Sequence, residues 1–318
     1  MRAARLHGIG DLRIETLDVP RPGPRDLLVR VEACGICPTD VRKYAIGTRD
    51  GYPLNPGHEW VGAVVEAGPD TTDWSIGQRV AGDTYAGYAE YAVLSVEPGA
   101  WSNGALAIPD DLDAPRATFV EPLADCVHAV RDQAQVVRGS RVCIVGAGQM
   151  GLQMVAVAAA TGAQVAVVEP HPDRRDLARQ FGADETADAS QLADAADGRD
   201  AVILTIGAAD LVATCVGAVA PGGRVVLFAG FGAAPHATID LDVIHYREVS
   251  LVGSEWIGTP PNQRRERYAD ALRLIAGGEV PVERLVSGEV GLDGIECAFA
   301  AVREQRGLKY VLRPWQRT

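Results

Sequence analysis

Short apolar runs alternate with Ala-rich segments through the middle of the chain. The segments between the runs have the length and composition of helices. Strands that alternate with helices are typical of a parallel sheet covered on both faces. We therefore expect an α/β domain with a doubly wound parallel sheet. Its predicted strands are Arg141 to Val145, Gln164 to Val168, Ala201 to Thr205 and Arg224 to Phe228.

The two ends of the chain follow another pattern. Up to about residue 100, β-branched and aromatic runs (27–32, 61–66 and 85–96) are punctuated by Pro and Gly, which predicts strands. After residue 256 we expect loops, one long helix (263–276) and a last short strand (309–312). The pattern indicates a β-rich domain of residues 1–122 plus 257–318, into which an α/β domain of residues 123–256 is inserted.

A glycine-rich turn follows the first strand of the α/β domain. Residues 146–151 read Gly-Ala-Gly-Gln-Met-Gly, and the next strand ends on Glu169. Such glycines allow a tight turn, close approach of a pyrophosphate and close packing of helix on strand, while the helix start attracts phosphate. The complete unit favours a Rossmann dinucleotide site over a βαβ unit that serves packing alone. The predicted cofactor-binding residues are Gly146, Gly148, Gln149, Met150, Gly151, Glu169, Arg174, Thr205 and Gly230.

The choice of cofactor depends on Glu169. A carboxylate there accepts hydrogen bonds from ribose hydroxyls and repels a 2′-phosphate, so we expect NAD(H) rather than NADP(H). Arg174 and Arg175 lie near enough in sequence to attract a phosphate instead. The preference therefore needs a direct measurement.

Composition narrows the class of protein. The net charge of −12 argues against nucleic acid or an anionic membrane as partner. Val142 to Val168 carries no charge and is long enough to cross a bilayer, but glycines interrupt it and no basic flank orients it. The six cysteines are widely spread and the N-terminus lacks a signal-peptide pattern, so we expect a reduced, cytoplasmic protein.

A second chemical signal is spread over three segments. They are Cys34 to Asp40 (CGICPTD), Gly57-His58-Glu59, and Glu121-Pro122. Each is weak alone, since a C-x-x-C pair can be redox-active or structural and a lone His is common. Together they offer thiolate, imidazole and carboxylate, the donors of a catalytic zinc with an open position.

Both signals together resemble the zinc-dependent medium-chain dehydrogenase/reductase family, which includes alcohol, polyol and threonine dehydrogenases. The matching motifs run in that family's order over nearly the whole chain: GICPTD, GHEWVGAVVEAG, GYAEYAV, EPLADCVHAV, GAGQMG, and APGGRVVLFAG followed by REVSLVGS. The resemblance implies that the β-rich domain is a GroES-like catalytic domain. It also implies one catalytic zinc and a nicotinamide cofactor.

The resemblance assigns roles to individual residues. Cys37 and His58 match the thiolate and imidazole ligands, and Glu121 matches an acid that holds zinc directly or through water in polyol-type members. Glu59 matches a carboxylate beside the metal. Thr39 would relay the substrate proton and Asp40 would orient His58. Cys34 would be a buried packing residue. The expected metal ligands are Cys37, His58, Glu59 and Glu121, and the expected catalytic residues are these four with Thr39, Asp40 and Asp125.

The sequence departs from the family in several places. No Cys lies between Cys37 and Cys126, so the lobe that carries a structural zinc in many members is missing, and we expect one zinc per chain. Arg42 occupies a position that is often His, and Pro38 removes a backbone N–H from the ligand loop. Asp125 stands where a small or hydroxylic residue is usual. It is either a contact for nicotinamide or substrate, or a surface acid at a helix N-terminus.

The expected activity is hydride transfer between NAD(H) and a secondary alcohol, polyol, aminocyclitol or hydroxy acid. One alternative is a metal-free NADPH-dependent quinone or enoyl reductase of the same fold, in which Cys37 and His58 would be idle. Another is a nucleotide-binding protein without catalysis. The resemblance implies a homodimer or homotetramer that acts on a small molecule.

Overall fold

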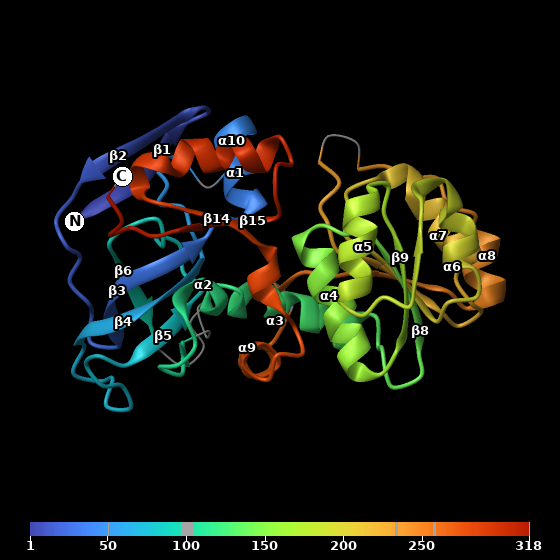
Figure 1. The fold of residues 1–318 in the computed structure, drawn as a ribbon, viewed down its shortest axis with the longest axis horizontal. Helices are drawn as coiled ribbons and strands as arrows, with labels where there is room; N and C mark the ends of the chain where they lie inside the picture. The colour runs from blue at the N-terminus through green and yellow to red at the C-terminus, as the bar shows by residue number, and fades with distance from the viewer. Residues whose placement is uncertain (50, 97–104, 233–234, 257–258, 318) are drawn as a thin grey trace. The chain divides into compact units, whose positions relative to one another are not determined.

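The chain divides into two compact units. The computed structural model describes residues 1–49, 51–96, 105–232, 235–256 and 259–317, so the expected domain boundary at residue 257 lies outside the described residues. The first unit comprises Met1–Pro122, Pro260–Ala276 and Pro281–Thr318, and the second comprises Leu123–Thr259 and Gly277–Val280 (Figure 1).

The second unit is built on a parallel sheet of six strands. In chain order its strands occupy positions 3-2-1-4-5-6, the order of a Rossmann fold. From edge to edge they are β10 (Glu185–Ala187), β9 (Gln164–Val168), β8 (Arg141–Val145), β11 (Ala201–Leu204), β12 (Arg224–Leu227) and β13 (Ser250–Gly253). The predicted doubly wound fold is confirmed.

Helices cover both faces of this sheet. Figure 1 shows α4 (Gln149–Thr161) and α5 (Pro172–Gln180) on one side of β8 and β9, and α7 (Val212–Ala218) and α8 (Leu241–Arg247) on the other. The short α6 (Leu192–Ala196) packs beside α7. Gly162 ends α4 in the left-handed conformation, which a glycine adopts without strain.

The uncharged stretch from residue 142 to 168 is strand, helix and strand. Val142, Cys143 and Ile144 are completely buried, as are Val165 and Val167 in the neighbouring strand. Because parallel strands bury both faces, they have the hydropathy of a membrane segment without being one. Within the described ranges, no helix has the length and apolarity needed to cross a bilayer.

The first unit is centred on a mixed sheet. Its strand order is β14 (Val286–Val290), β15 (Lys309–Leu312), β3 (Asp26–Gly35), β4 (Glu59–Ala67), β5 (Arg79–Gly82) and β7 (Leu106–Ala107), while β6 (Tyr91–Ser95) also pairs with β3. A separate hairpin is formed by β1 (Arg2–Gly8) and β2 (Asp11–Thr16). The unit's helices include α1 (Pro38–Ile46), α2 (Ala114–Ala117), α9 (Pro261–Ala276) and α10 (Ile295–Arg303).

The strand predicted over residues 85–96 is shorter than expected. The strand β6 begins at Tyr91, and Ala86 has a φ of 105°, which lies outside the strand region. The preceding backbone pairs with a different loop: the N–H of Gly87 donates to the carbonyl of Gly57 (2.9 Å), and that of Tyr88 to the carbonyl of Pro56 (3.2 Å). This loop leads directly into His58.

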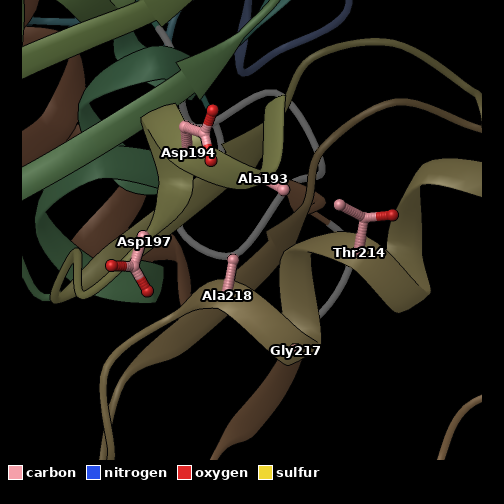
Figure 2. A pocket seen from close by; sticks show the side chains of 6 residues that line it. All are labelled: Ala193, Asp194, Asp197, Thr214, Gly217 and Ala218. Carbon is pink, nitrogen blue, oxygen red and sulfur yellow. The ribbon is translucent and has the colours of Figure 1, made fainter. Parts of the chain in front are cut away.

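A surface hollow lies between α6 and α7 (Figure 2). Its lining residues are Ala193, Asp194, Asp197, Thr214, Gly217 and Ala218. Asp197 and Ala218 lie at the ends of their helices, just before the strands that follow. The hollow is therefore on the amino-end side of the sheet. Dinucleotides bind outside the carboxyl ends of such strands, so it is not the cofactor crevice.

Candidate metal and cofactor sites

Sheet pairing in the first unit brings the predicted ligands together. Cys37 follows the end of β3 and His58 immediately precedes β4, and these strands pair antiparallel with Gly35 opposite Glu59. As a result, ligand atoms of Cys37, His58 and Glu59 all lie within 4.8 Å of one another.

These donors suit a zinc ion. Zinc takes thiolate, imidazole and carboxylate ligands at about 2.0 to 2.3 Å in a tetrahedral arrangement. Burial lowers the pKa of His58, but the neighbouring Cys37 and Asp40 outweigh it and hold that pKa well above its usual value. The surroundings of His58 thus favour a positive charge at the imidazole. Either a proton or a bound metal cation can supply that charge.

Asp40 and Thr39 occupy the first turn of α1. Asp40 is buried, and its Oδ2 lies 3.5 Å from Nδ1 of His58 and accepts from the N–H of Gly57 at 3.2 Å. Thr39 is exposed. Pro38 stands at the helix start, where its missing N–H costs no intrahelical hydrogen bond.

A buried lysine contacts the candidate ligand Glu59. The ammonium of Lys309, at the start of β15, forms an ion pair with Oε2 of Glu59, and the two side chains are 0% and 2% exposed. Burial lowers the pKa of Lys309, but the negative charges of Glu59 and Cys37 raise it by more than burial lowers it. The net shift is therefore upward. Lys309 therefore carries charge into the interior.

Two further carboxylates lie in the electrostatic range of this cluster. Burial raises the pKa of Glu121, in the first turn of α3 (Val120–Val127), to about 8; Glu59 and Asp83 also raise it, while His58 lowers it. Burial likewise raises the pKa of Asp83, whose Oδ2 accepts from the hydroxyl of Tyr268 at 3.1 Å. Glu121 is outside the group whose ligand atoms lie within 4.8 Å.

Cys34 differs sharply from Cys37. It is completely buried, its thiol donates to the carbonyl of Gly35 at 3.6 Å, and burial raises its pKa well above the usual value. All six cysteines are free thiols. The location of Cys34 is that of a packing residue.

The glycine-rich turn of the second unit forms an open cradle. Gly146 has a φ of 105°, and a Cβ there would lie 2.5 Å from Oγ1 of Thr205. A Cβ on Gly151 would overlap the carbonyl of Gly146. Nothing lies within 4 Å of a Cβ built on Gly148, which caps α4 without a side-chain hydrogen bond. A pyrophosphate fits this free space at the helix N-terminus.

Glu169 faces the same turn. Its Oε2 accepts from the N–H of Ala147 at 2.8 Å, and its Oε1 accepts from the N–H of His171 at 3.0 Å. The side chain is thereby fixed beside the cradle.

The other predicted cofactor residues lie close to the turn or near strand ends. Gln149 and Met150 begin α4, Arg174 lies in α5, and Gly230 follows β12. A Cβ on Gly207, after β11, would overlap the carbonyl of Gly230, so the loops after these neighbouring strands are in contact.

Asp125 belongs to the second unit. It lies in α3, which begins at Val120, so it is beyond the first turn. The interpretation of Asp125 as an acid at a helix N-terminus is therefore wrong, because α3 already begins at Val120 and Glu121 is the acid of its first turn. Its other interpretation, a contact for nicotinamide or substrate, stays a prediction.

Three residues of the site were not identified from the sequence. They are Lys309, Asp83 and Tyr88, of which Tyr88 is completely buried with its hydroxyl 3.0 Å from Oδ2 of Asp40. Lysine occurs only at positions 43 and 309 in a chain otherwise rich in Arg, and this contrast was the available signal for Lys309.

Comparison with known families gives two matches along the chain. Residues 23–107 match the alcohol dehydrogenase GroES-like domain, and residues 149–277 match the zinc-binding dehydrogenase domain. L-threonine 3-dehydrogenase of Pyrococcus horikoshii is 30% identical over 339 residues, covering 93% of this chain and 93% of that protein. Sorbitol dehydrogenase of Halalkalibacterium halodurans is 26% identical over 344 residues, with 97% of each chain covered.

A solved structure agrees in fold and sequence. A protein of Sinorhizobium meliloti 1021, assigned as a zinc-binding dehydrogenase and solved with NADP bound, superposes with a TM-score of 0.88 and 30% identity over 98% of this chain and 99% of its own. The β-rich first unit is thus a GroES-like domain and the second a Rossmann domain. The chain belongs to the zinc-type medium-chain dehydrogenase family.

Proposed function

We propose that the protein is a zinc-dependent, NAD-linked dehydrogenase of a secondary alcohol. The observation that carries this proposal is the cluster of one thiol, one imidazole and one carboxylate whose ligand atoms lie within 4.8 Å of one another. Cys37 and His58 would hold the metal, and Glu59 or Glu121 would supply the third protein ligand. We expect one zinc per chain.

The chain's own residues provide the positions and proton transfers of this reaction. When bound, zinc would act as a Lewis acid that lowers the pKa of the alcohol, and NAD would accept the hydride. Thr39, an exposed residue of α1 two positions after Cys37, would take the alcohol proton on its hydroxyl and pass it to solvent. Asp40 would fix the ring of His58 from its buried position.

NAD(H) is the proposed cofactor. Glu169 is held beside the glycine turn by two backbone N–H groups, where its charge opposes a 2′-phosphate. The Sinorhizobium meliloti relative binds NADP, so initial rates with both cofactors are the deciding measurement. A strong preference for NADP would contradict this part of the proposal.

The substrate class is a secondary alcohol with further polar groups: a polyol, aminocyclitol, amino alcohol or hydroxy acid. The relatives named for threonine and sorbitol support this class. A carboxylate as the third zinc ligand favours this polar substrate class over simple alcohols. The grouping of three acidic side chains, Glu59, Asp83 and Glu121, around the proposed zinc site favours it as well. We further propose that the protein is cytoplasmic, in keeping with its free thiols. We also propose that it forms a homodimer or homotetramer.

Zinc analysis of paired cysteine variants tests the proposal. The wild-type protein should hold one zinc per chain and oxidise members of a panel of polyols and hydroxy acids with NAD. Cys37→Ser should lose both zinc and activity, while the matched control Cys34→Ala should keep the metal.

The alternatives predict other outcomes. A metal-free quinone or enoyl reductase would keep its activity in Cys37→Ser and use NADPH. A nucleotide-binding protein without catalysis would bind NAD and oxidise nothing in the panel. Close to two zinc ions per chain would contradict the absence of a structural zinc.

A further inference from the structure

Tyr88 contacts both segments that carry the proposed zinc ligands. Its hydroxyl accepts from the backbone N–H of Cys37 at 3.3 Å and donates to Oδ2 of Asp40 at 3.0 Å. The carbonyl of Gly35 lies 3.4 Å from the same hydroxyl. Since a phenol has one proton, the shorter, charge-assisted bond to Asp40 receives it. The hydroxyl therefore binds the Cys37 loop on one side and a carboxylate on the other.

The backbone and ring of Tyr88 contact the second ligand segment, the loop that leads into His58. The N–H of Tyr88 donates to the carbonyl of Pro56 at 3.2 Å. Gly57 has a φ of 92°, and a Cβ built there would lie 2.6 Å from Cδ1 of the Tyr88 ring. The ring thus packs directly on the backbone of the residue before His58. The ring also lies in a T-shaped arrangement with Phe299 of α10, with ring centroids 6.1 Å apart.

The contact with Asp40 extends this connection to the imidazole. Oδ2 of Asp40 accepts from Tyr88 and from the N–H of Gly57 and lies 3.5 Å from Nδ1 of His58. Oδ1 of Asp40 is buried and has no hydrogen-bond partner among the described residues. Asp40 therefore depends on the few donors that reach its Oδ2, because losing one of them leaves buried carboxylate oxygens with even fewer partners, which is costly.

We propose that Tyr88 is a positioning residue for the metal: its hydroxyl joins the backbone at Cys37 to the carboxylate that orients His58. The thiolate and the imidazole are thereby held at a separation that one zinc ion can span. This inference rests on the proposed zinc site. It concerns how that site is preorganised, and it assigns Tyr88 no contact with substrate.

Removal of the hydroxyl tests the proposal. Tyr88→Phe keeps the ring packed on Gly57 and Phe299. Zinc affinity, measured by competition with a chromophoric chelator, should fall by about tenfold or more, the usual effect of losing a partner of a metal ligand. The absorption bands of the cobalt-substituted protein should also change, because they report ligand geometry.

Tyr44→Phe is the matched control. The Tyr44 ring also packs edge-on against Phe299, with centroids 5.5 Å apart, but its hydroxyl lies 3.3 Å from Oε1 of Glu296, outside the zinc cluster. This variant should bind zinc as the wild type does. An unchanged dissociation constant in Tyr88→Phe, with wild-type protein binding one zinc, would overturn the role of Tyr88 alone. Failure of the wild type to bind zinc would overturn the proposed function instead.

A double-variant comparison separates positioning from general packing. If the hydroxyl acts through Asp40, Asp40→Asn should weaken zinc binding, and adding Tyr88→Phe should cost much less than it does in the wild type. Fully additive losses would show that the hydroxyl does not act through Asp40. Asp40→Asn leaves the Tyr88 side chain intact, so its zinc affinity also tests the connection if Tyr88→Phe does not fold.

Discussion

Lys309 forms a buried ion pair with Glu59, a residue 250 positions earlier in the chain. The pair joins β15 to the start of β4 inside the GroES-like domain. A buried carboxylate without a counter-charge is strongly destabilising. In the proposed enzyme Glu59 has two positive partners, Lys309 and the metal, and the two compete for its oxygens.

Replacing Lys309 should show how strongly the buried Glu59 depends on a positive partner. Lys309→Met removes the charge and leaves Glu59 buried without it, so we expect the zinc-free protein to lose about 3 to 5 kcal/mol of stability. Zinc should restore more stability to this variant than to the wild type, since the ion then supplies the counter-charge that Lys309 no longer provides. Urea unfolding with and without zinc measures both effects.

Lys43→Met is the natural control, because Lys43 is the only other lysine in the sequence. Its ammonium lies over the exposed ring of Tyr85, 4.4 Å from the centroid, a contact worth about 0.5 to 1 kcal/mol. Equal unfolding midpoints for the two variants would show that the Lys309–Glu59 pair does not contribute to stability.

Two glycines of the turn, Gly151 and Gly148, should separate an effect on folding from an effect on cofactor binding. Gly151→Ala places a methyl group against the carbonyl of Gly146 and should cost about 1 to 3 kcal/mol of stability. Gly148→Ala has free space and a φ of −74°, so the fold should be unaffected. The methyl would instead occupy the room for the pyrophosphate and should weaken NAD binding at least about tenfold.

Calorimetric titration with NAD and thermal unfolding of both variants check this pair of expectations. A stable Gly148→Ala protein with wild-type affinity would show that the cofactor does not approach the turn at that position.

The strands of the Rossmann domain show what hydropathy can predict. The bounds of β8 and β9 agree with prediction at both ends, because strands buried on both faces give uninterrupted apolar runs. The edge strands β10 (ETA) and β13 (SLVG) were not predicted. Their residues are intermediate or exposed, so no apolar run marks them.

The candidate site shows a similar division. Cys37 and His58 lie in short motifs, and the motifs alone identified them. Lys309 lies in no motif, and Tyr88 lies in the GYAEYAV motif, which assigned it no role; the two act on Glu59 and Asp40, which are 250 and 48 positions away in the sequence. The residues next to Lys309 and Tyr88 in the sequence do not indicate these long-range contacts, because the contacts form only when the strands assemble into the sheet.

The charge of Glu169 should control cofactor choice. Glu169→Gln keeps a side chain of the same size beside Ala147 but removes the repulsion of a 2′-phosphate. Charge interactions of this kind amount to about 1 to 4 kcal/mol near a protein surface, so the preference for NAD should fall by roughly tenfold or more. The ratio of kcat/KM for NAD and NADP measures it, and an unchanged ratio would remove Glu169 from this role.

Asp125→Ala tests whether the second-domain acid serves catalysis. We expect impaired turnover with unchanged zinc content, because Asp125 lies in the Rossmann domain and is not among the proposed ligands. Asp125→Asn should retain more activity if hydrogen bonding matters more than charge. Normal kinetics in Asp125→Ala would leave the residue without a functional assignment.

The thiols should react in an order set by their surroundings. Burial raises the pKa of both Cys143 and Cys215 to about 12, so neither forms a thiolate near pH 8 in the folded protein. Cys297 is exposed and should be alkylated by iodoacetamide at once. Cys37 should be alkylated in zinc-free protein and protected when zinc is added, because a coordinated thiolate is not available as a nucleophile.

The same pKa shifts affect stability at high pH. Because the folded-state pKa values of Cys143 and Cys215 lie above the usual 9.0, the unfolded chain releases these protons first. The stability that the two protonated thiols contribute is fully present below pH 9 and is lost as the pH rises toward 12. Cys143→Ala with Cys215→Ala should therefore flatten the fall in unfolding free energy over this range, measured by urea unfolding at successive pH values. An identical slope in wild type and variant would show that these two thiols do not contribute to alkaline unfolding.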